Sequence, residues 1–404
     1  MNPIYKTKIL QGHSRPIKDI KFSNDGKFIF SASADRQVKK WDFKTNKLLL
    51  NFNHQASVNS IAISTDNKIM FTGDSTGCLY IWELNTNNLF KKIEFESIFN
   101  LSSIYLSFDN KYIIIVISSR KKNTKSFIRT YEISKFFNDT NNSDNNNDNN
   151  QNNNNNNNET NEKKSPEIFK VFECPNLETK YSKAKFADNT NNIIIVSRED
   201  GFLEKIDFNT SKIITSSKIH TEAILDFDIN FENDLILTSG KDCNMNLITL
   251  SNFKILQTFH PSNPNRNLNA CKLIILENPF FKLPNLIPFP ITIENMFDVY
   301  SHDYNEILID SKKKNNNNKF GQYKNIILCV VSGGQDSKFV TTTKTNEGGF
   351  DIIIYNGRTG EQLASFLDHF GPVNTLAVYE KIIASGAEDS TVRIHEIEHY
   401  LFDK

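Results

Sequence analysis

Three short segments carry residue types that could do chemistry. His395 and His399 form an HExxH pattern, in which two histidines one helical turn apart bind zinc beside a glutamate base. Residues 332–336 are rich in glycine, as phosphate-binding loops are, but lack the GxxxxGKS/T spacing. Residues 120–122 and 312–314 are basic runs that could contact RNA. Each function depends on the element that carries the segment.

The HExxH pattern lies in a segment that reads as a strand. Thr391–Ile397 alternates between apolar and polar residues, which is the period of a strand. On a strand, residues four apart are separated by roughly 13 Å, too far for two histidines to share one zinc ion. We therefore expect no metal site here, a plain turn at 332–336, and solvated basic runs. A zinc enzyme at this motif stays as an alternative.

Composition limits the remaining classes. The chain has 404 residues, and its 47 basic and 47 acidic residues give a formal net charge of zero. Direct binding of nucleic acid usually needs an excess of basic residues, so this composition argues against it. The five cysteines are scattered without a CxxC pair, which predicts reduced thiols in a cytoplasmic protein. No apolar run approaches the roughly 20 residues of a membrane span, and the first residues resemble no signal peptide. We expect no membrane contact, no cofactor and no catalytic residues.

An internal repeat is the strongest signal. His13 precedes His54 by 41 residues, and Trp41 precedes Trp82 by the same number. This period is typical of four-stranded propeller blades with a Gly-His and Trp-Asp signature. The first unit predicts strands at 17–23, 28–33, 37–43 and 47–53, with a turn at 24–26.

The unit resembles a WD repeat. That resemblance assigns structural roles to His13, Ser33, Asp35 and Trp41, which in the family form one hydrogen-bonded chain within a blade. Such a chain satisfies an imidazole, a carboxylate, a hydroxyl and an indole N–H at once. In the other units the corresponding positions are more degenerate, and those that we recognise are His54, Trp82, Asp200, Asp242, Asp389, and His395 in the Trp place.

Seven such units fit the length. We predict an all-β, seven-bladed WD40 β-propeller spanning 1–404 as a single domain, in which an N-terminal strand over 4–10 completes the last blade and closes the ring. Two insertions interrupt it. Residues 138–162 are almost wholly Asn and are expected to be disordered. Residues 278–324 form a Pro-, Lys- and Asn-containing insertion within blade six, and we expect both insertions to emerge on the same face.

The C-terminal quarter resembles one particular WD family. The segments SGGQDSKFVTTTKT from Ser332, DHFGPVNT from Asp368 and SGAEDSTVRIH from Ser385 resemble, in this order, the WD-repeat subunit I of eukaryotic translation initiation factor 3. The resemblance implies a non-catalytic scaffold that docks a helical segment of subunit b, associates with subunit g, and supports small-ribosomal-subunit loading and mRNA scanning. It also implies that Asp226 and Asp242 bind subunit b, through the charge-assisted bonds that a carboxylate offers an Arg or Tyr.

A second class of scaffold remains open. Another WD40 adaptor, such as a ubiquitin-ligase substrate receptor or a receptor-associated scaffold, has the same repeats, and the partners recovered with the protein distinguish the two. Asp242 is in addition the repeat Asp of its unit, so a purely structural role competes with partner binding.

Overall fold

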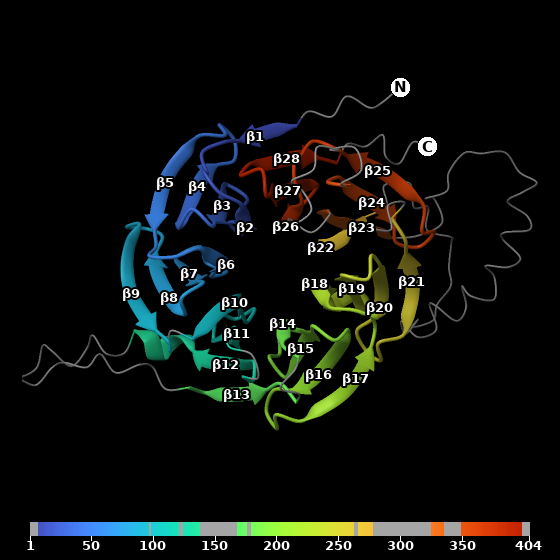
Figure 1. Ribbon diagram of the computed structural model, residues 1–404, viewed down its shortest axis with the longest axis horizontal. Coiled ribbons are helices and arrows are strands. Elements are labelled where there is room, and N and C mark those ends of the chain that lie inside the picture. The colour runs from blue at the N-terminus through green and yellow to red at the C-terminus, as the bar shows by residue number, and fades with distance from the viewer. Residues whose placement is uncertain are drawn as a thin grey trace, which may run out of the picture.

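The computed structural model describes residues 7–96, 98–119, 121, 124–137, 168–175, 179–261, 266–277, 325–334 and 349–397. Within these residues the chain forms seven four-stranded antiparallel sheets, arranged as the blades of a ring (Figure 1). This arrangement confirms the predicted seven-bladed propeller. The predicted insertions at 138–162 and 278–324 lie outside the described residues.

The blades follow one another in sequence. Blades 1 to 3 consist of β2 (Ile17–Phe22), β3 (Phe28–Ser33), β4 (Gln37–Asp42), β5 (Leu48–Asn53); β6 (Val58–Ile63), β7 (Ile69–Asp74), β8 (Cys78–Glu83), β9 (Asn88–Glu94); and β10 (Phe99–Leu106), β11 (Tyr112–Ser119), β12 (Phe127–Glu132), β13 (Lys170–Glu173). Blades 4 and 5 consist of β14 (Tyr181–Phe186), β15 (Ile193–Arg198), β16 (Phe202–Asp207), β17 (Ile213–Lys218); and β18 (Ile224–Asn230), β19 (Leu235–Gly240), β20 (Met245–Thr249), β21 (Ile255–Phe259).

The last two blades differ in how they are assembled. Blade 6 consists of β22 (Asn267–Glu277), β23 (Asn325–Gly334), β24 (Ile352–Asn356) and β25 (Gln362–Phe366), and blade 7 of β26 (Val373–Tyr379), β27 (Ile382–Ala387), β28 (Val392–Glu396) and the N-terminal β1 (Lys8–Leu10). Two short 3-10 helices, η1 (Ile133–Phe136) and η3 (Phe231–Asn233), follow β12 and β18.

The N-terminal strand closes the ring as predicted. β1 pairs antiparallel with β28, so that Lys8 faces Ile394 and Leu10 faces Val392. Figure 1 shows β1 lying along the outside of β28. Leu10 is 2% exposed and packs with residues of blades 1 and 7. Closure therefore joins the two ends of the described chain through both hydrogen bonds and apolar packing.

The hydrophobic core lies between blades rather than inside them. Each of the seven clusters of buried apolar residues is built from two neighbouring blades. A single four-stranded sheet cannot bury both of its faces, so each blade depends on the next, as in other repeat architectures. The ring is stable only when every interface, including that between blades 7 and 1, is formed.

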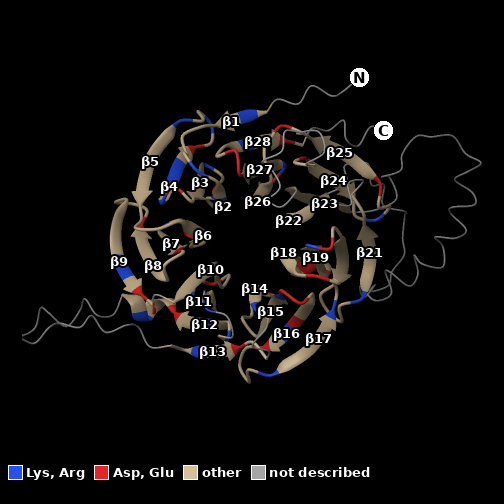
Figure 2. Cartoon of the chain, viewed as in Figure 1, with Lys and Arg blue, Asp and Glu red and all other residues tan. Residues whose placement is uncertain are grey.

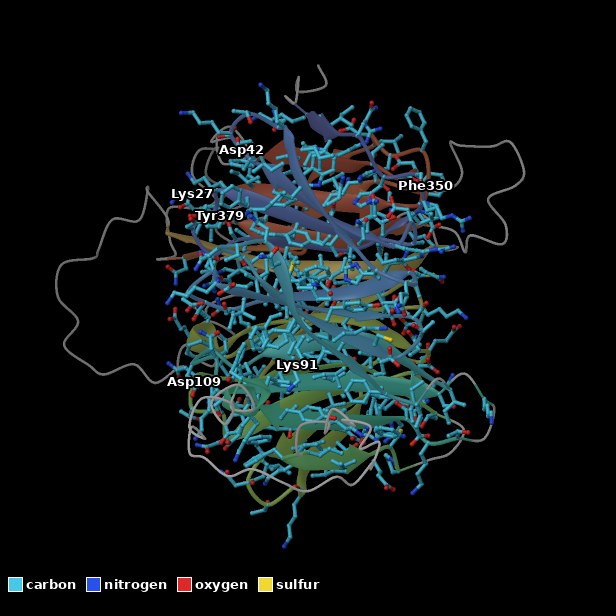
Figure 3. The ribbon with its side chains drawn as sticks, turned by 90° about the vertical axis from the view of Figure 1, so that its left-hand side faces the viewer. Lys27, Asp42, Lys91, Asp109, Phe350 and Tyr379 are labelled. Carbon is cyan, nitrogen blue, oxygen red and sulfur yellow. The ribbon has the colours of Figure 1, made fainter. Side chains whose placement is uncertain are left out.

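The disc has two faces, which Figure 3 shows on opposite sides of an edge view. The Tyr379 face carries the turns after the first strand of each blade, with Lys27, Asp109 and Tyr379. The Phe350 face carries the connections between blades and the turns between second and third strands. The chain leaves the described residues at the Tyr379 face after both η1 and β22, the positions at which the two insertions were predicted.

The first turn shows how local sequence fixes this geometry. Gly26 has a φ of +67°, and a Cβ at this position would lie 2.3 Å from the Tyr379 ring. Only glycine combines the left-handed backbone with such a close approach. The Asn24–Gly26 turn that the sequence predicted is therefore also a contact between blades 1 and 7.

Candidate functional site

Blade 1 contains a chain of four hydrogen-bonded side chains, which we call the blade 1 tetrad. Asp35 accepts a hydrogen bond from His13 Nδ1 at 2.7 Å, and His13 Nε2 lies 2.8 Å from Ser31 Oγ. Trp41 Nε1 donates to the same Ser31 hydroxyl at 2.8 Å. Burial lowers the pKa of His13 although Asp35 raises it, so the ring is neutral at pH 7. Nδ1–H then donates to Asp35, and Nε2 accepts a hydrogen bond from the Ser31 hydroxyl.

The hydroxyl in this tetrad is Ser31 and not Ser33 as the sequence analysis expected. Ser33 Oγ instead donates to the Arg15 carbonyl at 2.8 Å and accepts from the Asp35 amide, which shapes the turn. Residues two apart on a strand share a face, so alternation alone does not separate these two serines. The correct residue lies four positions before the repeat Asp.

The same offset identifies residues that sequence reasoning missed in other blades. Thr238 Oγ1 lies 2.9 Å from His220 Nε2 in blade 5, and Ser385 Oγ lies 2.8 Å from His369 Nε2 in blade 7. Both precede the repeat Asp of their blade by four residues. A Ser or Thr at this offset recurs in four units, and this recurrence was the available signal.

Blade 2 keeps the hydroxyl but loses the carboxylate. His54 Nε2 and Trp82 Nε1 both bond Thr72 Oγ1, at 2.7 and 3.0 Å. Because Thr76 stands in the Asp place, His54 Nδ1 bonds the Phe52 carbonyl instead, at 3.1 Å. Burial lowers the pKa of His54 to about 4. The imidazole is therefore held neutral without an acidic partner.

Blade 4 replaces the tetrad with ion pairs. Asp200 accepts from Arg198 Nε at 2.9 Å, and Arg198 Nη1 donates to the buried Glu204 at 2.6 Å. Asp200 thus sits at its predicted repeat position but bonds an arginine rather than a histidine. One guanidinium thus serves two carboxylates, so this group carries a net negative charge, and Glu204 Oε2 has no hydrogen-bond partner among the described residues. Removing Arg198 would leave Glu204 as a buried charge without its cation.

Blade 7 departs from blade 1 at one position. Asp389 accepts from His369 Nδ1 at 2.9 Å, as Asp35 does from His13. His395 occupies the Trp place on β28, is 1% exposed, and stacks on Phe366 with 4.7 Å between ring centroids. Neither of its ring nitrogens has a hydrogen-bond partner among the described residues.

The HExxH histidine therefore lies on a strand, as predicted. His395 faces Ile383 across the β27–β28 ladder. His399 lies outside the described residues, as do residues 120, 122, 312–314 and 335–336. Ser332, at the start of the Gly-rich segment, is buried in β23 and pairs with Ile352 of β24. The described half of that segment is thus strand rather than phosphate-binding loop.

The two predicted partner-binding carboxylates are not displayed as free charges. Asp226 is 2% exposed, and its carboxylate accepts from Lys183 Nζ at 2.6 Å and from the Cys271 amide of blade 6 at 3.2 Å. Burial raises the pKa of Asp226, but Lys183 and neighbouring lysines hold it well below the ordinary range. The Asp226 carboxylate is thus buried and already engaged, and its role in binding subunit b stays a prediction.

Asp242 is likewise engaged. It bonds His220 Nδ1 at 2.8 Å through one oxygen and accepts from the Thr221 amide at 2.9 Å through the other. Burial raises the pKa of Asp242, but the hydrogen bond and charge of His220 lower it to about 2. Asp242 is therefore the structural Asp of blade 5, and it also fixes the loop that begins at Thr221.

A hollow of about 850 Å³ lies beside this loop on the Phe350 face, lined by residues of blades 3, 4 and 5. The half-buried Ala223 and Leu225 contribute apolar surface to it. The charged residues of its lining are Glu199, Asp200, Glu222, Lys218 and Lys241. Neither Asp226 nor Asp242 lines this hollow, although their sequence neighbours Leu225 and Lys241 do. Acidic residues outnumber lysines by three to two in this lining, and together with the apolar surface they suit a partner segment that combines apolar and basic residues.

Around the ring, acidic and basic positions occur on many blades (Figure 2). Among the described residues no helix is both long and apolar enough to cross a membrane.

Comparisons with known proteins agree with this architecture. The family model described as "TEP-1 C-terminal beta-propeller" matches residues 13–84, and the model "WD domain, G-beta repeat" matches residues 360–396. The β-propeller domain of Myceliophteria thermophila Cps50 (Swd1) superposes with a TM-score of 0.63 at 12% identity and covers 97% of this chain and 100% of that one. The WD40 propeller domain of Doa1 gives 0.61 at 13% identity, covering 98% of each.

Curated relatives share one name. "Eukaryotic translation initiation factor 3 subunit I" of Schizosaccharomyces pombe is 22% identical over 412 residues, which cover 100% of this chain and 98% of that protein. The protein of that name from Candida glabrata is 24% identical over 213 residues, 52% of this chain and 46% of its own length. That of Xenopus tropicalis is 25% identical over 231 residues, 57% of this chain and 55% of its own.

Proposed function

The chain resembles the WD-repeat subunit I of eukaryotic translation initiation factor 3 along its whole length, and from this premise we propose that it is a non-catalytic scaffold subunit of that complex. In this role it docks a helical segment of subunit b, associates with subunit g, and supports small-ribosomal-subunit loading and mRNA scanning in the cytoplasm. The similarity to the fission-yeast subunit over essentially both full lengths carries the proposal.

The hollow on the Phe350 face is the docking site that the geometry favours for subunit b. Its apolar surface at Ala223 and Leu225 would take the apolar side of a helix, and the exposed Glu199 and Glu222 would take basic side chains. Asp242 would act by holding the Thr221 loop beside it, and Asp226 by anchoring β18 to blade 6. Their predicted importance for docking is then that of positioning residues.

Affinity purification of the tagged chain tests the scaffold role. We expect subunits b and g to be recovered together with the small ribosomal subunit. Recovery of ubiquitin-ligase subunits without initiation-factor subunits would replace the proposal with that of another WD40 adaptor.

A charge reversal tests the docking site. The double variant Glu199→Lys and Glu222→Lys should reduce recovery of subunit b by about tenfold or more, since it places like charges against a basic helix. Glu232→Lys is the matched control, because it makes the same exchange at an exposed glutamate on the Tyr379 face. Equal recovery by both variants would rule out this hollow as the site.

A further inference from the structure

Four lysines from three blades line two cavities at the centre of the ring, which we call the central channel. Asp19 and Lys21 alternate on β2, Lys183 and Lys185 on β14, and Asp226 and Asp228 on β18, which is the spacing that points side chains to one face of a strand. Lys272 on β22 completes the set. Charged residues two apart on the innermost strands are the sequence signal that marks this group.

The carboxylates of this group already serve the fold. Asp19 accepts the Ile61 amide of blade 2 at 2.9 Å, and Asp228 accepts the Leu273 amide of blade 6 at 3.1 Å. Asp226 does the same for Cys271 and also holds Lys183 at 2.6 Å. Each aspartate therefore ties its blade to the next, and only Lys183 has a close, dedicated carboxylate.

Among the residues that the structure describes, the other three lysines have only two carboxylates between them, those of Asp228 and Asp19. Lys185 Nζ and Lys272 Nζ both approach one oxygen of Asp228, at 3.1 and 3.5 Å, and Lys21 Nζ lies 3.4 Å from Asp19. Lys185 also donates to the Phe227 carbonyl at 2.5 Å. An ammonium can donate three hydrogen bonds. Within the described part of the chain, Lys21 and Lys272 have only these long contacts.

Two of these ammonium groups lie against the ring of Tyr105, and Lys272 lines the same cavities. Lys185 Nζ lies 4.8 Å and Lys21 Nζ 5.4 Å from the centroid of the Tyr105 ring. Burial raises the pKa of Tyr105, yet Lys185, Lys21 and Lys272 together lower it below its ordinary value. Burial lowers the pKa of Lys272, but Asp228 and Asp226 raise it well above its ordinary value, so it is charged at neutral pH. Lysines outnumber carboxylates among the residues that line the two cavities, so this part of the channel carries a net positive charge.

The two cavities meet there. One of about 280 Å³ opens toward the Phe350 face and one of about 510 Å³ toward the Tyr379 face, and both are lined by Lys21, Tyr105 and Lys272. We propose that this waist of the channel binds a small phosphate-class oxyanion between the ammonium groups of Lys21, Lys185 and Lys272, with the Tyr105 hydroxyl as a further donor. Charge-assisted hydrogen bonds inside a partly enclosed cavity are strong enough to hold such an ion.

Pyrophosphate and inorganic phosphate are the probes. Calorimetric titration of the full chain should give saturable binding of pyrophosphate with about one site, and weaker binding of phosphate. Sodium chloride at the same ionic strength controls for screening, and sulfate for the general stabilisation that such salts give. Heat and melting shifts that chloride or sulfate reproduce in full would overturn the proposal.

Substitutions test whether pyrophosphate binds at the lysines of the central channel. Lys272→Met and Lys21→Met should each weaken pyrophosphate binding about tenfold, the loss of one charge-assisted hydrogen bond. Lys27→Met is the matched control, since this lysine is on the same blade with a 71% exposed side chain, and its affinity should stay within about twofold. Tyr105→Phe, which removes only the hydroxyl, keeps the test valid if a lysine variant does not fold, and it should weaken binding about threefold. Unchanged affinity in all channel variants would refute the site.

Discussion

Blades 1 and 7 are neighbours with the same polar core and different fourth residues. In each, a histidine bridges an aspartate and a serine hydroxyl at 2.7–2.9 Å. Blade 1 completes this chain with Trp41, whose N–H bonds the shared hydroxyl, whereas blade 7 places the buried and unbonded His395 there. The histidine–aspartate pair thus does not require the tryptophan.

The two blades also differ in how the chain builds them. Blade 1 is continuous from β2 to β5, while blade 7 takes its outermost strand from the other end of the described chain. Thr7 Oγ1, just before β1, donates to Asp368 at 2.8 Å, and Asp368 in turn lies 3.6 Å from His395. In blade 7 the N-terminal segment that closes the ring therefore contacts the surroundings of His395, the residue that replaces the tryptophan. Four sets of variants test how blades 1 and 7 differ.

Removing β1 should have the largest effect. Deletion of residues 1–10 removes a three-residue ladder and the buried Leu10, which together are worth about 5 kcal/mol of unfolding free energy or more. That is comparable with the whole stability of many domains. Urea denaturation measures it, with deletion of residues 1–6, which leaves β1 intact, as the control. Equal midpoints for the full chain and the longer deletion would show that closure contributes little.

Replacing the fourth tetrad residue by alanine should cost more unfolding free energy in blade 1 than in blade 7. Trp41→Ala is expected to cost about 3–5 kcal/mol, because it empties a large buried site and leaves the Ser31 hydroxyl without its indole donor. His395→Ala should cost only about 1–2 kcal/mol, since the cavity is smaller and two unsatisfied nitrogens are removed with it. Chemical denaturation of both variants gives the comparison. Similar losses would mean that the tryptophan hydrogen bond adds nothing.

Acid should act on blade 7 through His395. Burial lowers its pKa to about 4, and the nearby Asp368 does not restore it. Between pH 4 and 6.5 this histidine therefore binds a proton in the unfolded state, where its pKa is near 6.5, but not in the folded state. Stability is fully present above pH 6.5 and is lost as the pH falls toward 4, by about 2 kcal/mol at pH 5.

His395→Phe should flatten this pH dependence by that amount, because phenylalanine keeps the stack on Phe366 and cannot titrate. His260→Phe, at an exposed histidine after β21, is the control. Thermal melting from pH 7.5 to 5 records both, and parallel curves for wild type and His395→Phe would contradict the assignment.

The sequence predicted the ring, its closure and most repeat positions, because these depend on period and alternation. It misplaced the tetrad hydroxyl, since Ser31 and Ser33 share a strand face and differ only in depth along it. It also gave no sign that Asp226 is buried, although the innermost strands turn such residues into the channel, where they accept hydrogen bonds from amides of the next blade. Contacts between blades join residues about 40 positions apart, and spacing within a repeat does not reveal them.

The smallest loss of unfolding free energy is expected for His395→Trp, which places the blade 1 tryptophan in blade 7. In blade 1 the tryptophan packs against glycine, and a Cβ on Gly12 would lie 3.1 Å from Trp41 Cη2. The residue before the tetrad histidine in blade 7 is Asp368, which has the side chain that Gly12 lacks. His395→Trp alone should therefore overpack the site and cost about 1 kcal/mol, even though its indole could reach the Ser385 hydroxyl.

The double variant His395→Trp with Asp368→Gly recreates the blade 1 combination and should recover this loss. Asp368→Gly alone should be destabilising, because it removes the bond from Thr7 and adds backbone freedom. A double-mutant cycle should then give a favourable coupling of about 1 kcal/mol between the two positions. Additive effects would instead mean that the histidine in blade 7 is independent of the aspartate before it, and that the two blades differ by one residue rather than by a matched pair.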